Sequence, residues 1–353
     1  MFSELSGSYS VLFWVLIGSI SLLILIMLTF IWVLVRLRRG NERIRRKRSA
    51  LEEIWQPFIL EVLSGNEGPE VLWRMVIQED TMHFLDVLLR YYRRFEGRER
   101  ADILTLARPY IPNLVDIFES DIPEERAKAV QLLGVFGLDR YGEQLTGALN
   151  DPSLLVAMNA ARALANSRYP EYGKYIIEVM PRFEIFSANL RASLLAACGQ
   201  EIIPLLRKTF ASSGQPIIVR RAAGEALLDL ADPLAVIMAS HFVETEDDPD
   251  ILIASLQILE THGRLEDKTK IHPLLFWTDA AVRIHAAKAM VSLATQADRA
   301  ILRDIFDDPD AWISMHATRG LRNIGAKHML QSMAESEHPR SEFARQYLTG
   351  DNP

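Results

Sequence analysis

The hydrophobic residues of this chain follow two patterns, one continuous and one periodic. Residues 11–35 read VLFWVLIGSISLLILIMLTFIWVLV and contain no charged residue. Beyond residue 48 the apolar positions recur at steps of three and four, as at Leu85, Leu88 and Tyr92, which is the spacing of one helical face. Because no strand-like alternation bounded by turn residues occurs in the sequence, the chain is predicted to be all-α.

The continuous apolar run predicts a transmembrane helix over residues 11–35. A helix needs about 20 apolar residues to cross a hydrocarbon layer about 30 Å thick. Trp14 and Trp32 lie 18 residues apart, roughly 27 Å on a helix, which suits one indole at each membrane interface. A cleaved signal peptide is the alternative, but residues 1–10 carry no basic residue and no small-x-small cleavage site follows the run.

Basic residues directly after this run predict its orientation. Residues 36–48 hold eight Lys or Arg against one acid, whereas residues 1–10 hold one acid and no base. Since Lys and Arg beside a membrane segment stay in the cytoplasm, we expect a single-pass protein of the inner (cytoplasmic) membrane, with its N-terminus outside and its C-terminal domain cytoplasmic. The basic residues act as a topology signal alone or also bind anionic lipid; they are Arg36, Arg38, Arg39, Arg43, Arg45, Arg46, Lys47 and Arg48.

Turn residues divide the rest of the chain. Ser49 and Glu52 have the S-x-x-E spacing of a capping box, which predicts a helix start, and the Gly- and Pro-containing run 65–69 predicts its end. Four helices are expected between residues 70 and 120. The predicted parts are a leader (1–10), a transmembrane helix (11–35), a basic juxtamembrane segment (36–48), an N-terminal helical region of the solenoid (49–120), and repeats with C-terminal capping helices (121–353).

A repeat begins near residue 120, where turns containing Pro or Asp lead into helices with basic residues and alanines. Its origins lie at residues 123, 152, 187, 216, 249, 279 and 309, at spacings of 29, 35, 29, 33, 30 and 30. Proline suits the first turn of a helix and a preceding Asp caps it. A period near 30 in an all-helical chain predicts stacked helix pairs. Four glycines are expected to cap helix C-termini, namely Gly134, Gly199, Gly263 and Gly325.

The pattern Asp-Pro-x-x-x-Arg-x-x-Ala-Ala at this period resembles HEAT repeats, in the short form also seen in phycobilin-lyase-like proteins. The resemblance covers about residues 120 to 335 in seven copies, although the copy at 187 lacks Asp-Pro and the copy at 249 lacks the Arg. It implies a right-handed α-solenoid whose Arg-bearing helices line the concave face. Together with residues 11–35 it suggests a membrane-anchored bacterial-type HEAT-repeat protein.

The net charge of −7 hides an uneven distribution. The first 48 residues hold 8 basic and 2 acidic groups, so the remainder holds 31 basic and 44 acidic groups, or −13. An acidic balance argues against a nucleic-acid binder, which needs a positive field toward phosphate. Cys198 is the only cysteine, which excludes an intrachain disulfide and a cysteine-built metal site; its apolar surroundings predict a buried thiol.

Six arginines recur in the repeats, and two interpretations of them stay open. In one, each Arg pairs with an Asp of a neighbouring repeat; in the other, they form a concave strip for an acidic partner. We favour the ladder for most of them, because repeats must match one another before they match a ligand. The seven repeat helices nevertheless hold ten basic and eight acidic residues, a net charge of +2, which leaves a net charge of −15 for the rest of residues 49–353. Acidic residues are therefore scarce on these helices, which favours a groove that binds an acidic partner. The six are Arg126, Arg162, Arg191, Arg220, Arg283 and Arg319.

Other side chains add to a candidate partner-binding set. Trp and Arg are enriched at binding hot spots, although core packing is the more common fate of a Trp such as Trp312. His285 and His316 occupy similar positions one repeat apart, and are expected to be packing or groove residues. The full candidate set is Arg162, Arg191, Arg220, Arg221, Arg283, His285, Trp312, His316 and Arg319.

Catalytic and cofactor motifs are absent from the sequence. It has no HExxH, no His followed by Glu, no glycine-rich phosphate loop and no G-x-S-x-G elbow. Helical-repeat iron hydroxylases of the deoxyhypusine type need repeated His-Glu pairs, so that activity is not expected. We predict no catalytic residue, no metal and no cofactor.

These patterns lead to a functional hypothesis and two alternatives. We expect a membrane-anchored scaffold or regulatory subunit that binds a protein partner through its concave face, because solenoids offer long concave surfaces. The partner is expected to be locally acidic and membrane-bound or membrane-proximal. The first alternative is a lyase or isomerase, as the phycobilin-lyase resemblance permits, and the second is a helical-repeat nucleic-acid protein.

Overall fold

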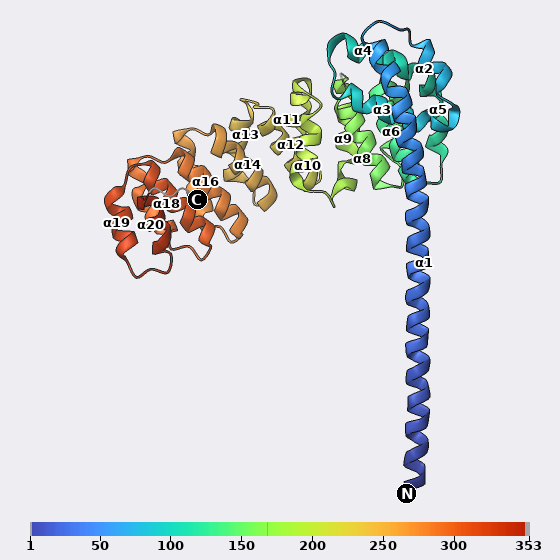
Figure 1. Ribbon diagram of the computed structural model, residues 1–353. Coiled ribbons are helices and arrows are strands. Elements are labelled where there is room, and N and C mark those ends of the chain that lie inside the picture. The colour runs from blue at the N-terminus through green and yellow to red at the C-terminus, as the bar shows by residue number, and fades with distance from the viewer. Residues whose placement is uncertain (1, 168, 350–353) are drawn as a thin grey trace. The chain divides into compact units, whose positions relative to one another are not determined.

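The computed structural model describes residues 2–167 and 169–349, and this part of the chain is helical with no strand (Figure 1). This confirms the predicted all-α class. The chain forms two compact units, Met1–Asn113 and Leu114–Pro353.

The first unit is organised by one long helix, α1 (Phe2–Leu63), which contains Pro57. Its C-terminal part buries Trp55 and Ile59 and contacts the short helices that follow. The Trp55 ring meets Phe84 edge to face at 5.1 Å. The helices that follow in this unit are α2 (Glu70–Met75), η1 (Gln78–Asp80), α3 (Thr81–Tyr92), α4 (Gly97–Ala107) and η2 (Arg108–Tyr110). The boundary between the units falls within α5 (Ile111–Asp116), and η3 (Ile117–Glu119) belongs to the second unit.

Two sequence predictions for this unit had different outcomes. Four α-helices do lie between residues 70 and 120, as predicted. The predicted helix start at Ser49 is wrong, because α1 runs through this position without a break. Inside a helix the backbone amide of each residue bonds to the carbonyl four residues earlier, so the amides after Ser49 need no side-chain cap.

The predicted transmembrane helix over 11–35, and with it the inner-membrane localisation, is wrong. Among the residues described, no helix offers a stretch that is both long enough and apolar enough to span a bilayer. The side chain of Trp14 and those of the leader 1–10 lie outside the described residues.

Several side chains of the basic segment 36–48 contact neighbours in the first unit. Arg38 Nε lies 3.2 Å from Glu42 Oε1, and Lys47 Nζ lies 2.7 Å from Asp80 Oδ1. The Arg38 pair lies within α1, whereas the Lys47 pair ties α1 to η1. The side chain of Arg39 lies outside the described residues. Binding of anionic lipid by this segment stays a prediction.

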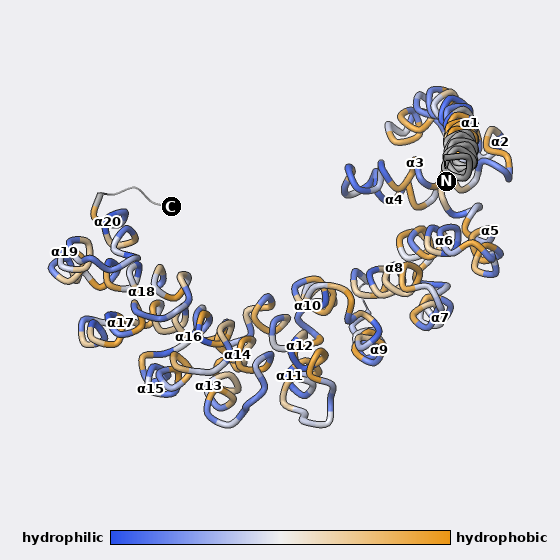
Figure 2. Tube along the Cα trace, turned by 90° about the horizontal axis from the view of Figure 1, so that it is seen from below, coloured by the Kyte–Doolittle hydropathy of each residue, from blue (hydrophilic) through white to orange (hydrophobic). Residues whose placement is uncertain are grey.

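The second unit consists of two rows of helices, and Figure 2 shows the inner row along the inside of its curve. Successive inner helices contact one another, and all seven begin at or within three residues of the predicted repeat origins. The inner row is α6 (Pro123–Phe136), α8 (Leu154–Ala165), α10 (Ala188–Ala196), α12 (Ile217–Asp229), α14 (Pro249–His262), α16 (Ala280–Leu293) and α18 (Ala311–Asn323).

The outer row is shorter and less regular, and several of its helices have 3-10 turns at their ends. A last helix, α20 (Ser341–Thr349), contacts α18 and α19, so it covers the end of the inner row. The outer row is α7 (Leu138–Ala148), η4 (Pro170–Tyr172), α9 (Gly173–Val179), η5 (Met180–Phe183), η6 (Gln200–Ile202), α11 (Ile203–Ala211), α13 (Ala235–Thr245), η7 (Leu265–Asp267), α15 (Lys268–Ile271), η8 (His272–Phe276), η9 (Gln296–Asp298), α17 (Arg299–Ile305) and α19 (Lys327–Glu335).

Aspartates cap three of the inner helices as the sequence predicts. The Asp248 carboxylate accepts from the amides of Asp250 and Ile251 at the start of α14. Asp279 does the same for the first turn of α16, and Asp310 accepts from the Trp312 amide of α18. Each cap satisfies backbone donors that have no partner within the helix. The N-terminus of each of these helices therefore follows from local chemistry.

Glycines in this unit either follow helices as C-terminal caps, as predicted, or allow two helices to pack closely, which was not predicted. Gly199 and Gly325 follow helices at positive φ, 86° and 74°, as expected of C-terminal caps. Gly263 also follows a helix, but at φ −63°. The prediction for Gly134 is wrong, because this residue lies inside α6. There it lets α6 approach the Ala163 backbone of α8.

Replacing Gly134 by alanine is therefore expected to destabilise the protein although alanine favours helix. The added methyl would lie 3.2 Å from the Ala163 Cα and closer still to its side chain. Overpacking costs about 1–3 kcal/mol against about 1 kcal/mol gained in helix propensity. The contact at Ala163 is close enough to favour the upper end of the first range, so we expect a net loss of up to about 2 kcal/mol in urea unfolding. Gly147→Ala in α7 is the control, since nothing lies within 4 Å of its Cβ position; it should raise stability. Equal effects of both changes would contradict the close approach.

Candidate functional site

The inner helices share one register, which becomes clear when residues are numbered from the N-cap. The fourth position after the N-cap is Arg126 in α6, Arg191 in α10, Arg220 in α12 and Arg283 in α16. We call these four residues the ladder arginines. Two of them, Arg191 and Arg220, are more than nine-tenths buried. Their shared position therefore directs the guanidinium groups into the packing between repeats.

Three ladder arginines pair with an acid that precedes the next inner helix. Arg126 Nε and Nη2 each lie 2.9 Å from an oxygen of Asp151, and this hydrogen bond lowers the pKa of Asp151. Arg283 Nε donates to Asp308 at 3.0 Å. Arg220 donates to Glu246 and, at 3.0 Å, to the Phe210 carbonyl. The predicted pairing of a recurring arginine with an Asp of a neighbouring repeat is therefore found at Arg126 and Arg283, whereas at Arg220 the acid is a Glu.

The fourth ladder arginine binds backbone instead of an acid. Arg191 Nη1 donates to the carbonyls of Phe183, Glu184 and Phe186, in the longer turn that makes the spacing after residue 152 reach 35 residues. Burial lowers the pKa of Arg191. The ladder arginines in the candidate set, Arg191, Arg220 and Arg283, thus direct donors to groups of the protein itself.

A second register position lies on the same inner helices, nine residues after each N-cap. In four consecutive helices this position holds Glu225 of α12, Gln257 of α14, Lys288 of α16 and Arg319 of α18. We call these four residues the ninth-position stripe. Each member follows the one before it by about one repeat of the sequence. The composition of the stripe changes from acidic through neutral to basic.

The acidic end of the stripe belongs to an ion-pair network. Arg221 Nε lies 2.8 Å from Glu225 Oε1, and its Nη1 contacts Asp250 of the next inner helix. Arg191 is close enough for Glu225 and Asp250 to act on its charge. Positive and negative charges therefore balance at α12 and α14.

The basic end of the stripe has no such balance. His285 lies one turn before Lys288 on α16, and His316 lies one turn before Arg319 on α18. Among the described residues, neither Lys288 nor Arg319 forms an ion pair. We call these four residues the cationic cluster, and Arg319 is its exposed member.

Both histidines of the cluster have lowered pKa values. Burial lowers the pKa of His285 to about 4, helped by the charges of Lys288, Arg221 and His316. Burial likewise lowers the pKa of His316 to about 4, helped by Lys288 and Arg319. The charges that lower these two pKa values are those of basic side chains. At neutral pH both rings are therefore uncharged, and the positive charge of the cluster rests on Lys288 and Arg319.

An exposed aromatic ring lies beside the cationic cluster. Trp312 is 61% exposed, although most Trp side chains in proteins are largely buried. It precedes His316 by four residues on α18, so the two side chains share a helical face. An exposed indole next to unpaired cations is typical of a binding surface.

The nine candidate residues thus separate into three groups. His285, Trp312, His316 and Arg319 come together at α16 and α18. Arg162 is exposed at the ninth position of α8, distant from them along the inner row. The remaining four have partners within the protein, namely Arg191, Arg220, Arg221 and Arg283.

Three residues of the inner face escaped the sequence-based set. These are Lys288, Glu225 and Gln257 of the ninth-position stripe. Lys288 precedes Arg319 by the same repeat interval that separates His285 from His316. This shared interval could have identified Lys288, whereas burial of Glu225 could not be read from the sequence.

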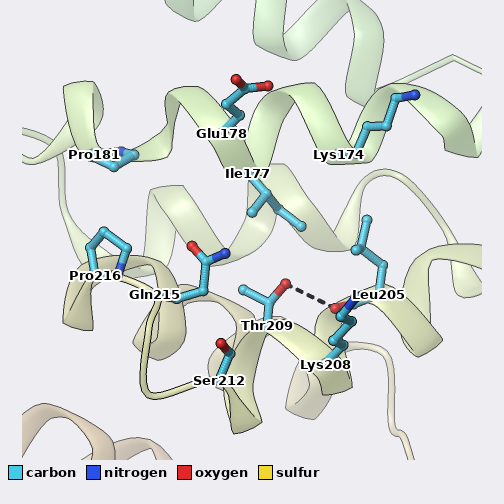
Figure 3. Close-up of a pocket in the computed structure, with 10 residues that line it drawn as sticks. All are labelled: Lys174, Ile177, Glu178, Pro181, Leu205, Lys208, Thr209, Ser212, Gln215 and Pro216. Atoms are coloured by element: carbon cyan, nitrogen blue, oxygen red, sulfur yellow. Dashed lines mark hydrogen bonds between the residues drawn. The ribbon is translucent and has the colours of Figure 1, made fainter.

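A pocket in the outer row is the other concave candidate (Figure 3). It has a volume of about 380 Å³ and lies between α9 and α11. Ile177 points into it, but the charged ends of Lys174 and Glu178 point away from it. The Thr209 hydroxyl donates to the Leu205 carbonyl at 2.9 Å. Other polar residues of its lining are Lys208, Ser212 and Gln215.

Metal and thiol chemistry have little support in the described part of the chain. No group of three or more His, Cys, Asp and Glu residues is placed there to hold a metal ion. Cys198 is buried, as predicted, and burial raises the pKa of its thiol to about 11. At neutral pH such a thiol is protonated and a poor nucleophile.

Comparisons with known proteins bear on the fold only. No family model matches the chain, and no curated protein does. Human deoxyhypusine hydroxylase is similar at 15% identity and a TM-score of 0.31, over 70% of this chain and 98% of that chain. The CpcE–CpcF complex of phycocyanin lyase from Nostoc is similar at 19% identity and a TM-score of 0.30, over 68% of this chain and 86% of that chain. An engineered protein is similar at 16% identity and a TM-score of 0.38, over 75% of this chain and 88% of that chain. The first two are HEAT-like helical-repeat proteins.

Proposed function

We propose that this protein is a HEAT-like repeat scaffold or regulatory subunit, wound as a right-handed solenoid, that binds a locally acidic segment of a protein partner on its inner face. The observation that carries the proposal is the cationic cluster: Lys288 and Arg319 form no ion pair among the described residues, while three of the four ladder arginines, Arg126, Arg220 and Arg283, do. Trp312 supplies an apolar anchor beside them.

Electrostatics and packing favour this assignment over other parts of the inner row. A carboxylate placed near Lys288 or Arg319 meets a charge that no acid of the protein neutralises. Because His316 is buried and His285 is partly buried, the local dielectric is lower than that of water, which strengthens such a contact. At α12 and α14 the same carboxylate would meet Glu225 and Asp250 as well as arginines, and would gain less.

Reversing the two charges of the cluster is expected to weaken acidic-peptide binding about 30-fold. Each reversal removes one attraction and adds one repulsion, together about 1 kcal/mol for a partly exposed pair, and two reversals give about 2 kcal/mol. The test uses Lys288→Glu plus Arg319→Glu in the full chain. The dissociation constant of a fluorescent peptide rich in Asp and Glu is measured by anisotropy.

The matched control reverses two lysines of the outer-row pocket, Lys174→Glu plus Lys208→Glu. This variant has the same net charge as the cluster variant but leaves the inner face intact, so its dissociation constant should stay within about twofold. Binding should also weaken as salt rises to about 0.5 M, where charges are screened beyond about 4 Å. Equal loss in both variants, or no binding by the wild type, would refute the proposed function.

A further inference from the structure

The two charges of the cationic cluster lie on helices that contact each other. Lys288 of α16 and Arg319 of α18 both follow their N-cap by nine residues, and α16 packs against α18. The charge of Lys288 lowers the pKa of both His285 and His316, and the charge of Arg319 lowers the pKa of His316. The cations of both helices therefore act on one shared site.

A ligand can reach the charged groups of this site. Arg319 is exposed, and Lys288 is half-buried with an ammonium group that is not enclosed. Neither forms an ion pair among the described residues. His316 is 7% exposed, and the Nδ1 atom of His285 is enclosed. The ligand therefore binds to Lys288 and Arg319, and the two uncharged rings form the surface beside these groups.

The charge of the site decides which anion fits best. With both rings uncharged at neutral pH, Lys288 and Arg319 give the cluster a charge of +2. A phosphorylated side chain carries about −1.5 to −2 at pH 7 and has three strong acceptor oxygens. One carboxylate carries only −1, so it leaves one cation unneutralised.

The two cations also suit phosphate by their donor geometry. The Arg guanidinium offers a planar fork of N–H donors, and the Lys ammonium offers three donors on a flexible stem. A single phosphoryl group can accept from both at once, whereas two carboxylates would have to come from two residues that are ordered separately.

We infer that the cationic cluster binds a phosphorylated Ser, Thr or Tyr side chain of the protein partner, with Lys288 and Arg319 as its charged donors. Trp312, 61% exposed on the helical face of His316, offers an apolar contact that a peptide can use and a free phosphate ion cannot. This inference rests on the proposed function and adds the chemical class of the acidic group to it.

The first experiment compares four fluorescent peptides of otherwise identical sequence on the full-length protein. They carry phosphoserine, Glu, Ser or an Asp-Asp pair at one place, and anisotropy gives their dissociation constants. The phosphoserine peptide is expected to bind about tenfold more tightly than the Glu peptide, and more tightly than the Asp-Asp peptide of similar charge. Equal affinity of the phosphoserine peptide and either acidic peptide would overturn the inference.

The second experiment removes the two cations with Lys288→Gln plus Arg319→Gln. The loss should be about 25-fold for the phosphoserine peptide and about fourfold for the Glu peptide, so the preference for phosphate falls to about twofold. The matched control is Lys174→Gln plus Lys208→Gln on the outer row, which should keep the tenfold preference. Urea unfolding confirms that both variants fold. An unchanged preference in the cluster variant, or equal losses in both variants, would overturn the inference.

The third experiment tests whether the phosphoryl group must belong to a peptide. Inorganic phosphate should displace the labelled phosphoserine peptide much more weakly than the unlabelled phosphoserine peptide does. Equal competition would show that the site recognises the bare anion, which would overturn the inference. If the phosphate preference is absent but the cluster reversal still weakens binding of the Asp- and Glu-rich peptide, the proposed function survives. If none of the peptides binds, both fail.

Discussion

Replacing Arg220 by alanine is expected to lower the free energy of unfolding by about 3 kcal/mol. Arg220 is 3% exposed, and its removal leaves the Glu246 carboxylate and the Phe210 carbonyl without their donor. Breaking a buried pair by removing one partner costs about 3–5 kcal/mol. The low end applies here because Glu246 is partly exposed. Urea denaturation of the full chain measures the change.

The matched variant is Arg319→Ala, which removes the same side chain from an exposed position of an inner helix. Exposed substitutions away from special features change stability by within about 0.5 kcal/mol. We expect Arg319→Ala to unfold like the wild type and to weaken acidic-peptide binding about twofold, since it removes one attraction without adding a repulsion. Arg220→Ala should show a large shift in the urea midpoint. Similar midpoints for the two variants would show that the ladder contributes nothing to stability.

Stability is expected to fall by about 3 kcal/mol or more when the pH drops from about 6.5 to about 4. His316 has a pKa of about 4 in the folded chain against about 6.5 unfolded. The lowered pKa means that the unfolded state takes up the proton first. The stabilising effect is therefore complete above about 6.5 and is lost as the pH falls through the folded pKa. His285 adds a smaller amount, because it is only partly buried.

The pH dependence is tested with His285→Gln plus His316→Gln, which should flatten the stability profile between about pH 6.5 and 4. The control is His328→Gln on α19, whose side chain is exposed. Asp151, Asp232 and Asp298 also have lowered pKa values. Their contribution to stability is lost only as the pH falls below the usual pKa of an Asp, so they affect the profile at lower pH than the histidines do. A double variant as pH-sensitive as the wild type would exclude the two histidines as the cause.

Much of the second unit could be predicted from the sequence because its signals are local. The seven inner helices begin near the predicted origins, since Asp248, Asp279 and Asp310 cap the amides of the next few residues. Apolar periodicity identified the helices themselves. Burial of Cys198 followed from its apolar neighbours.

The candidate site was less predictable, because it depends on how each helix is rotated against its neighbours. The sequence placed Arg319 and Arg283 in one class. The structure puts Arg283 four residues after its N-cap and Arg319 nine residues after its own. Five residues turn a helix by about 140°, so the two guanidinium groups serve different surfaces. One pairs with Asp308, and the other belongs to the cationic cluster.

In the first unit, local sequence patterns led to two wrong predictions. The apolar run and the basic segment correctly indicated helix, but the capping box at Ser49 had no effect inside the continuous α1. A capping motif acts only where the preceding residues leave the helical conformation. The predicted membrane span over 11–35 was wrong for the part of the chain that the structure describes.

By itself, the sequence determined the helical class, the repeat period, the helix caps and the arginine ladder as the favoured arrangement, because each depends on near neighbours in the chain or on strict repetition. Only the tertiary structure showed that Lys288 and Arg319 lack acidic partners among the residues it describes, while three ladder arginines, Arg126, Arg220 and Arg283, have them. It alone showed that Glu225 and Gln257 keep unpartnered acceptors on the same stripe. Such pairings join residues about one repeat apart, and they depend on the rotation and separation of packed helices, which no local pattern encodes.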